Sequence, residues 1–153
     1  MLDANPHYRI GEAASAAGLS AASIRFYEKQ GLLAAGPRSA ARYRLYSDED
    51  VHRLRFIRQC RALDMSLDEV GTLLALDLRS PADCARAQQT LDAHLSHVRE
   101  RLAELAALER DLLSLRQRCD GSGPQCGIME ALHARADQPA APGEPRGAGH
   151  RHV

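Results

Sequence analysis

The sequence has few aromatic residues and no net charge, and both features narrow the possible folds and functions. Aromatic side chains make up 4% of the 153 residues and tryptophan is absent, whereas hydrophobic residues together reach 44%. A core of this composition is built mainly from alanine and leucine, which favours packed helices over a β-sandwich. The length fits one or two small units and not a large enzyme.

Long apolar runs are also missing. No stretch is long enough to span a membrane and no signal peptide is recognisable, so we expect a cytoplasmic protein. Four cysteines in that compartment favour metal or redox chemistry over structural disulfides. Because no nucleophile–base pair, paired carboxylates or phosphate-cradling loop occurs in a credible context, we expect no catalytic activity.

The zero net charge conceals a difference between the front and the back of the chain. Through Arg61 the chain has ten Lys and Arg against six Asp and Glu, and beyond it ten against fourteen. A basic front joined to an acidic back is compatible with DNA binding at the front alone.

Residues 81–118 form the segment around which the rest of the chain is organised. After Pro81 this segment has neither glycine nor proline, and it is rich in strong helix formers. Ser80 and Pro81 favour a helix start, since serine caps the helix and proline lacks an N–H that the first turn does not need. Apolar residues recur at three- and four-residue steps, at Leu91, Leu95, Val98, Leu102, Leu105, Leu108, Leu112 and Leu115. Such a seam requires a partner helix.

Each end of this predicted helix carries a cysteine. Cys84 and Cys119 are 35 positions apart, which is roughly 50 Å along one straight helix, so they cannot meet within one chain. In an antiparallel pair of chains, Cys84 of one copy would lie near Cys119 of the other. Cys126 follows Cys119 after a short loop that contains glycine and proline. We therefore predict a homodimer with three thiols at each end, Cys119 and Cys126 from one subunit and Cys84 from the other.

The front of the chain predicts a helix-turn-helix. A helix over about residues 10–17 is followed by a turn at Gly18 and a second helix over about residues 20–30. On the second helix, Ile24 and Phe26 are expected to face the core. The side chains expected to offer hydrogen-bond donors to DNA are Ser23, Arg25, Tyr27 and Lys29.

Residues 36–46 interleave basic and aromatic side chains and predict a short hairpin, the wing of a winged helix-turn-helix. A β-ribbon that exposes Arg38, Arg42 and Arg44 would clamp phosphates, because guanidinium groups match phosphate oxygens bidentately. Further helices are predicted over about residues 48–63, 66–76 and 128–136.

Several segments, taken in order, resemble the MerR family of transcription regulators. The matching segments are YRIGEAA at 8–14, SIRFYE at 23–28, GLL at 31–33, RYRLY at 42–46 and LRFI at 54–57. The resemblance implies a mainly α fold, with a winged helix-turn-helix DNA-binding domain and a long antiparallel coiled-coil dimerisation helix. The DNA contacts that it implies are Arg25, Tyr27, Arg42, Tyr43, Arg44 and Tyr46.

Four regions follow from the motifs and the resemblance together. Residues 1–79 are predicted to form the DNA-binding domain with its linker helices, and residues 80–118 the dimerisation helix. Residues 119–137 are predicted to form a metal-binding loop and a short C-terminal helix. The proline- and glycine-rich residues 138–153 predict a disordered tail.

The three predicted thiolates form a soft ligand set that suits Cd(II), Pb(II), Hg(II) or Zn(II). The loop over residues 119–128 most resembles the cadmium- and lead-responsive branch of the family. Copper(I)-responsive members resemble it less, because they use two cysteines and have serine where Cys84 stands. Two alternatives stay open: a Hg(II) or Zn(II) sensor of the same family, and a thiol protein that buffers metal.

Other residues with metal-binding chemistry are assigned no ligand role. Cys60 is expected to be a small structural residue, and a disulfide between Cys119 and Cys126 competes with metal binding. Whether a second metal site exists is left open for His94, His97, His133, His150 and His152.

The resemblance also implies a mechanism. The homodimer would bind a palindromic promoter operator and repress transcription without metal. With Cd(II) or Pb(II) bound, it would distort the DNA so that RNA polymerase can engage, because a protein that favours one DNA shape controls the promoter through that shape.

Overall fold

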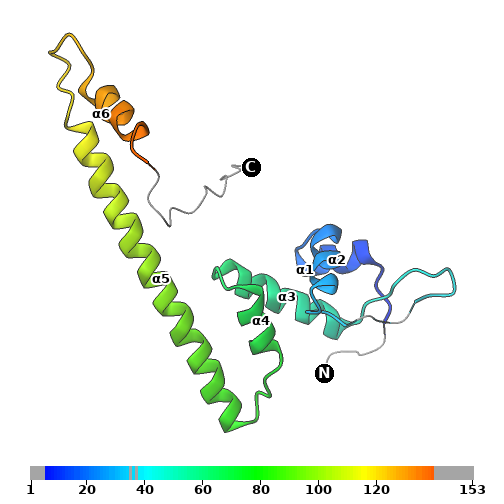
Figure 1. Ribbon diagram of the computed structural model, residues 1–153. Coiled ribbons are helices and arrows are strands. Elements are labelled where there is room, and N and C mark those ends of the chain that lie inside the picture. The colour runs from blue at the N-terminus through cyan, green and yellow to red at the C-terminus, as the bar shows by residue number, and fades with distance from the viewer. Residues whose placement is uncertain (1–5, 35, 37, 140–153) are drawn as a thin grey trace. The chain divides into compact units, whose positions relative to one another are not determined.

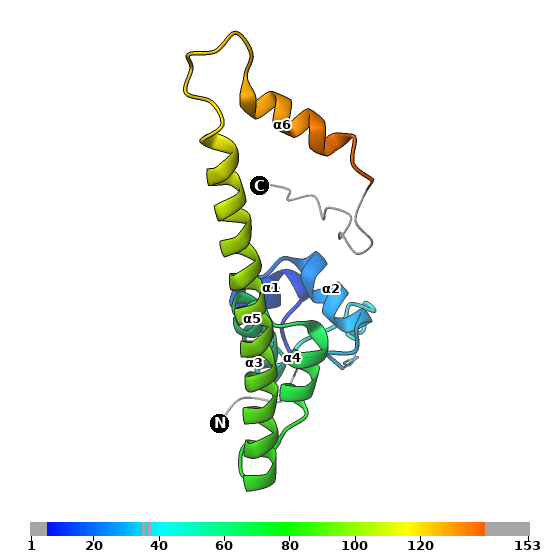
Figure 2. The same ribbon diagram turned by 60° about the vertical axis from the view of Figure 1, so that its left-hand side comes forward.

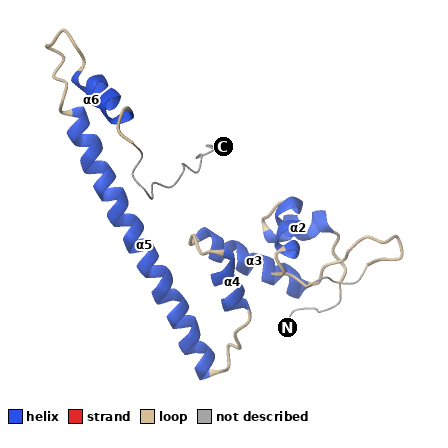
Figure 3. Ribbon diagram, viewed as in Figure 1, coloured by secondary structure: helices blue, strands red, loops and turns tan. Residues whose placement is uncertain are grey.

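The computed structural model describes residues 6–34, 36 and 38–139, and within them the chain is helical without a named strand (Figure 1, Figure 3). The mainly α fold expected from the sequence is confirmed. Of the predicted tail, only residues 138 and 139 are among the described residues. His150 and His152 lie outside them. The helices are α1 (Ile10–Ala17), α2 (Ala21–Lys29), α3 (Asp48–Ala62), α4 (Leu67–Leu74), α5 (Pro81–Arg116) and α6 (Gly127–Ala136).

The chain divides into two compact units, Met1–His97 and Val98–Val153. The boundary falls within α5, so the first half of this helix belongs to the same unit as α1 to α4. None of the described helices is both long enough and apolar enough to cross a membrane.

Reciprocal hydrogen bonds between side chain and backbone fix where α3 and α4 begin. The Ser47 hydroxyl accepts from the Asp50 N–H at 3.1 Å, and the Asp50 carboxylate accepts from the Ser47 N–H at 2.9 Å. Ser66 and Glu69 repeat this capping box at the start of α4, at 3.2 and 2.7 Å. Because these bonds satisfy amides that have no partner inside the helix, the sequence sets both helix starts locally.

The core of the first unit lies among α1, α2, α3 and α4, where α1 packs against α2 and α3, and α3 packs against α4. The largest side chains that are almost wholly enclosed are Tyr46, Ile24, Leu54, Ile57 and Val70. Cys60 is buried in the same core, and this burial raises the pKa of its thiol. The structural role predicted for Cys60 is confirmed.

Gly18 makes the turn that ends α1. Its φ of 69° lies in the left-handed region, and a Cβ there would stand 2.1 Å from Arg58 Nη1. The same guanidinium donates to the Ala17 carbonyl at 2.8 Å, and Arg55 donates to the Ala16 carbonyl at 2.9 Å. Arginines of α3 therefore satisfy carbonyls at the C-terminus of α1, where cations are favoured.

In the second unit, α6 folds back beside the C-terminal part of α5 (Figure 1, Figure 2). Arg135 of α6 donates two hydrogen bonds to the Asp111 carboxylate of α5, both at 2.7 Å. This bidentate pair lowers the pKa of Asp111. Leu115 and Ala131 are the buried residues of the two helices.

Candidate DNA-binding and metal-binding sites

Helix α2 presents a different set of side chains from the one predicted. Arg25 is exposed, as expected for a DNA contact, but Phe26 is 47% exposed and Tyr27 only 9%. The predicted inward position of Phe26 is therefore wrong, and the Tyr27 ring packs in the core. Residues three apart share a helix face, so Ile24 pairs with Tyr27; a spacing of two, as between Ile24 and Phe26, is that of a strand.

The wing is a hairpin held by isolated bridges, without a named strand among the described residues. Antiparallel bridges join Arg38 with Arg44 and Tyr8 with Tyr46. At the tip, the Tyr43 carbonyl accepts from the Ser39 N–H at 2.7 Å. The Tyr43 and Arg42 side chains are exposed, so the tip presents one aromatic and one cationic group outward.

Arg44 is enclosed by the protein, although the sequence predicted it to be exposed. Its side chain is 16% exposed, and its Nε lies 3.2 Å from Glu28 Oε1, an ion pair without hydrogen-bond geometry. The guanidinium also stacks 4.8 Å from the Tyr46 ring centre and donates to the Ala34 carbonyl. Arg44 thus ties the wing to α2.

Tyr46 is 1% exposed and its hydroxyl donates to Glu28. Burial, followed by this hydrogen bond, raises the pKa of the phenol. The ring is therefore a core side chain, and the direct DNA contact predicted for Tyr46 is replaced by a role in holding the wing against α2.

A hollow of about 380 Å³ lies between α2 and the wing. It collects four basic side chains against a single carboxylate, which suits phosphate oxygens. Its lining residues are Arg25, Glu28, Lys29, Leu33, Gly36, Arg38 and Arg44.

Two of the predicted metal ligands lie in the second unit, on the loop between α5 and α6. A Cβ on Gly127 would stand 2.4 Å from the Arg118 carbonyl oxygen, so the backbone before α6 lies directly against the backbone after α5. This close approach brings Cys126 beside Cys119, and both thiols are free.

The N-terminus of α6 creates a favourable environment for a Cys126 thiolate. The Met129 amide, then the Ile128 amide, lowers the pKa of the Cys126 thiol, although no capping hydrogen bond forms. The neighbouring Cys119 thiol acts in the same direction. A thiolate is the form that binds metal, so this end of the helix favours the ligand form.

Cys84 is exposed on the first turn of α5, in the first unit. The residue before it, Asp83, accepts from the Asp77 N–H of the preceding linker at 2.8 Å. The Asp83 N–H in turn donates to the Ser80 hydroxyl at 3.3 Å. The first turn of α5 is therefore tied directly to the linker that follows α4.

Within the described part of one chain, no group of three His, Cys, Asp or Glu side chains is placed to hold a metal ion. Cys119 and Cys126 supply two soft donors. Cys84, the third predicted ligand, belongs to the first unit.

The seam predicted on α5 is exposed in the single chain, with Leu115 as the buried residue of this helix. A groove of about 360 Å³ runs between its leucines near the C-terminal end. Since contiguous exposed leucine marks an interaction surface, the seam is available to a partner. Its exposed members are Leu91, Leu95, Val98, Leu102, Leu105, Leu108 and Leu112.

Comparison with known proteins places these features in a family. Residues 8–77 match the model of the MerR HTH family regulatory proteins, and residues 51–115 match a model described as MerR, DNA binding. The HTH-type transcriptional regulator HmrR of Sinorhizobium medicae is 38% identical over 128 residues, covering 80% of this chain and 84% of that protein. The chain belongs to the MerR family. It is therefore a DNA-binding transcription regulator and not an enzyme.

Two further MerR-family relatives are similar over most of their length. The regulator ZntR of Escherichia coli K12 is 36% identical over 133 residues, covering 84% of this chain and 94% of ZntR. The crystal structure of the transcription regulator PbrR691 from Ralstonia metallidurans, in complex with lead(II), superposes with a TM-score of 0.73 at 43% identity. The superposition covers 82% of this chain and 99% of the PbrR691 chain.

One residue of this MerR-family chain has a role that the sequence did not reveal. His94, considered for a second metal site, instead contacts the Leu63 carbonyl through Nε2 at 2.8 Å and the Glu69 carboxylate through Nδ1 at 3.3 Å. His97 and His133 are exposed. Only the three- and four-residue seam pattern could have indicated that the His94 ring borders the packed side of α5.

Proposed function

We propose that this protein is a metal-responsive transcription regulator that binds a promoter as an antiparallel homodimer. One observation carries the proposal: two adjacent thiols follow one end of α5, a third occupies its first turn, and an uncovered leucine seam lies between. A second chain running the opposite way covers the seam and completes the thiol set at both ends.

The front unit supplies the DNA contacts. Arg25 on α2, with Arg42 and Tyr43 at the wing tip, is exposed and suited to phosphates and base edges. Arg44 stacks on the Tyr46 ring, pairs with Glu28 of α2 and lines the basic hollow, so it holds the wing against α2. Because the dimer is two-fold symmetric, its operator is a palindrome.

The effector is a soft divalent cation held by Cys84 of one subunit with Cys119 and Cys126 of the other. Three thiolates offset the charge of a divalent ion better than two do. Cd(II) or Pb(II) is the preferred inducer, and the lead(II) complex of a 43% identical regulator supports this choice. The relationship to ZntR supports Zn(II) as the alternative, with Hg(II) as a further soft ion.

Regulation follows from the position of the ligands. Drawing Cys84 of one chain toward the loop of the other displaces the first turn of α5 and the linker tied to it. The two DNA-binding units then turn relative to each other and change the twist of the DNA between them. Without metal the dimer represses; with metal the reshaped promoter is engaged by RNA polymerase.

Mixed dimers test the shared site. In a dimer of one Cys84→Ser chain and one Cys119→Ser chain, the first keeps Cys119 and Cys126 while the second keeps Cys84, so one complete site remains. We expect half of the wild-type Cd(II) stoichiometry, measured by titration under reducing conditions.

The matched control combines a Cys119→Ser chain with a Cys126→Ser chain, which breaks both loops. We expect this dimer to hold no high-affinity Cd(II). If both mixed dimers bind equally poorly, the ligands do not cross the subunit interface and the proposed site is wrong.

A further inference from the structure

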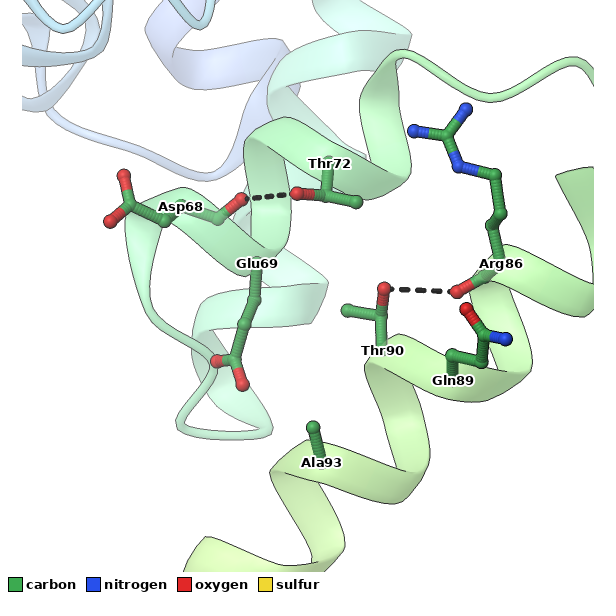
Figure 4. A pocket seen from close by; sticks show the side chains of 7 residues that line it. All are labelled: Asp68, Glu69, Thr72, Arg86, Gln89, Thr90 and Ala93. Carbon is green, nitrogen blue, oxygen red and sulfur yellow. Dashed lines mark hydrogen bonds between the residues drawn. The ribbon is translucent and has the colours of Figure 1, made fainter.

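Helices α4 and α5 face each other across an open groove of about 400 Å³ (Figure 4). The threonine hydroxyls that line the groove form hydrogen bonds within their own helices. Thr72 donates to the Asp68 carbonyl and Thr90 to the Arg86 carbonyl, both at 3.0 Å. These threonines therefore do not tie the two helices together.

His94 does connect α5 to the opposite side of this groove. Its Nδ1 lies 3.3 Å from Glu69 Oε2, and Figure 4 shows the Glu69 carboxylate directed toward the turn of α5 that carries Ala93. Its Nε2 lies 2.8 Å from the Leu63 carbonyl oxygen. The side chains of His94 and Glu69 are 12% and 17% exposed, so the contact is largely shielded from water.

The two partners of His94 mark the ends of two helices. Leu63 is the residue at which α3 ends, and Glu69 belongs to the capping box that starts α4. Carbonyl and carboxylate oxygens accept hydrogen bonds, so each ring nitrogen of His94 faces an acceptor. Neither ring nitrogen is then free for a metal ion, which removes His94 from the candidates for a second site.

We propose that His94 is the positioning residue that couples movement of α5 to the α3–α4 turn of the DNA-binding unit. The proposal rests on the proposed function, since it names the contact through which the metal signal reaches the DNA-binding helices. Displacement of α5 moves the His94 ring, and the contacts of this ring with Leu63 and Glu69 move the end of α3 and the start of α4.

Burial tends to raise the pKa of the Glu69 carboxyl, but hydrogen bonds from Ser66 and from His94 outweigh it and the pKa is lowered. Glu69 is therefore a carboxylate while it caps α4, which keeps the attraction to His94 in place.

The test compares three full-length variants with the wild type. His94→Ala removes both contacts, and Glu69→Gln keeps an amide oxygen to cap α4 while removing the charge that faces His94. His97→Ala is the control, because His97 is an exposed histidine three residues along the same helix. An operator is first selected from random DNA with the wild-type protein and placed in a promoter spacer.

For each variant, Cd(II) affinity, operator affinity without metal, and the Cd(II)-dependent increase in transcription in vitro are measured. We expect His94→Ala and Glu69→Gln to leave both affinities within about twofold and to lower the transcription increase by about tenfold, a typical coupling. His97→Ala should match the wild type. A fourth variant combines His94→Ala with Glu69→Gln. Its transcription increase should be no lower than that of His94→Ala, since both changes remove the same interaction.

A full transcription increase in His94→Ala would overturn the proposal. Loss of Cd(II) or operator affinity in both His94→Ala and Glu69→Gln would also overturn it, since His94 would then serve folding and not coupling. A wild-type protein that binds Cd(II) or DNA but shows no Cd(II)-dependent transcription would instead reject the proposed function.

Discussion

Gly127 follows Cys126 directly, where the start of α6 approaches the backbone after α5. Because a Cβ there would meet the Arg118 carbonyl at 2.4 Å, Gly127→Ala must push the start of α6 away from the end of α5. Overpacking of this kind costs about 1–3 kcal/mol. We expect Gly127→Ala to weaken Cd(II) binding by about tenfold or more in competition titrations, with operator affinity unchanged.

Gly123→Ala is the control in the same loop. A Cβ at Gly123 would meet the Gln125 carbonyl oxygen at 3.5 Å, an ordinary contact. Equal metal affinity in the two alanine variants would show that the Gly127 contact does not set the distance between the thiols.

Substitutions at two arginines of the wing distinguish the loss of a DNA contact from the loss of wing stability. Arg42→Ala removes an exposed cation, so it should weaken binding to all DNA sequences. It should also reduce the salt-dependence slope by about two for a dimer, one for each lost phosphate contact. Thermal stability should not change.

Arg44→Ala should also lower the free energy of unfolding, by about 1–3 kcal/mol, because Glu28 loses its ion pair and the Ala34 carbonyl loses its donor. Denaturant melts of the two variants measure the difference. Equal stability in Arg42→Ala and Arg44→Ala would contradict the enclosed role of Arg44.

At single residues, the sequence indicated which residues matter more accurately than which way their side chains point. Cys60 was correctly predicted to be structural, and Arg25 is exposed as expected. Phe26 is exposed and Tyr27 is buried, the reverse of the prediction, because a nine-residue helix has few positions from which to assign its buried face. The enclosure of Arg44 and the contacts of His94 depend on residues 16 and 31 positions away, and no local pattern carries such information.

At the level of elements, prediction was accurate wherever the signal was local. The helices start at the residues that Ser20, Ser47 and Ser66 cap, because a serine side chain satisfies the first free amides. The wing was predicted as a ribbon but forms only isolated bridges. Its pairing is too brief for a named strand, since a tight turn follows one residue after Arg38.

The α5 seam can be tested by one pair of substitutions. Leu102 is exposed on the seam, and Glu100 lies on the opposite side of the helix, because two residues rotate by about 200°. Leu102→Lys and Glu100→Gln each raise the net charge of the chain by one, the first by adding a cation and the second by removing an anion. We expect Leu102→Lys to shift the protein toward monomer in sedimentation experiments, since each copy loses about 1.5–3 kcal/mol of leucine burial.

Glu100→Gln should leave the protein dimeric. A Leu102→Lys protein that stays dimeric at the same concentrations would place the interface elsewhere and remove the basis for the shared thiol site.

For the whole molecule, dimer formation and metal binding should fail together. A wild-type dimer should hold one Cd(II) per chain with three sulfur ligands, measured by metal analysis and X-ray absorption under reducing conditions. A monomeric Leu102→Lys chain keeps only the two thiols beside α6, so its absorption spectrum should show two sulfurs and its affinity should be lower. Three sulfurs in the monomer would contradict the intersubunit site.

The basic front of the chain contributes less free charge than its composition indicates. Arg53, Arg55 and Arg58 donate to backbone carbonyls of the first unit, and Arg44 faces Glu28. Other cations of this unit, among them Arg25 on α2 and Arg42 on the wing, are exposed. The charge count predicted DNA binding at the front of the chain, but only the fold shows which of its charges contact the protein itself.

In the proposed mechanism, the hydrogen bond from the Asp77 amide to Asp83 places Cys84 next to the linker that it would move. A displacement of Cys84 would reach this linker within one helical turn. The length of α5 would decide whether Cys84 meets the loop of the partner chain. The movement of the linker would depend on the few residues around Cys84. Changes to the leucine seam of α5 should therefore alter dimer formation, whereas changes at its first turn should alter the response to metal.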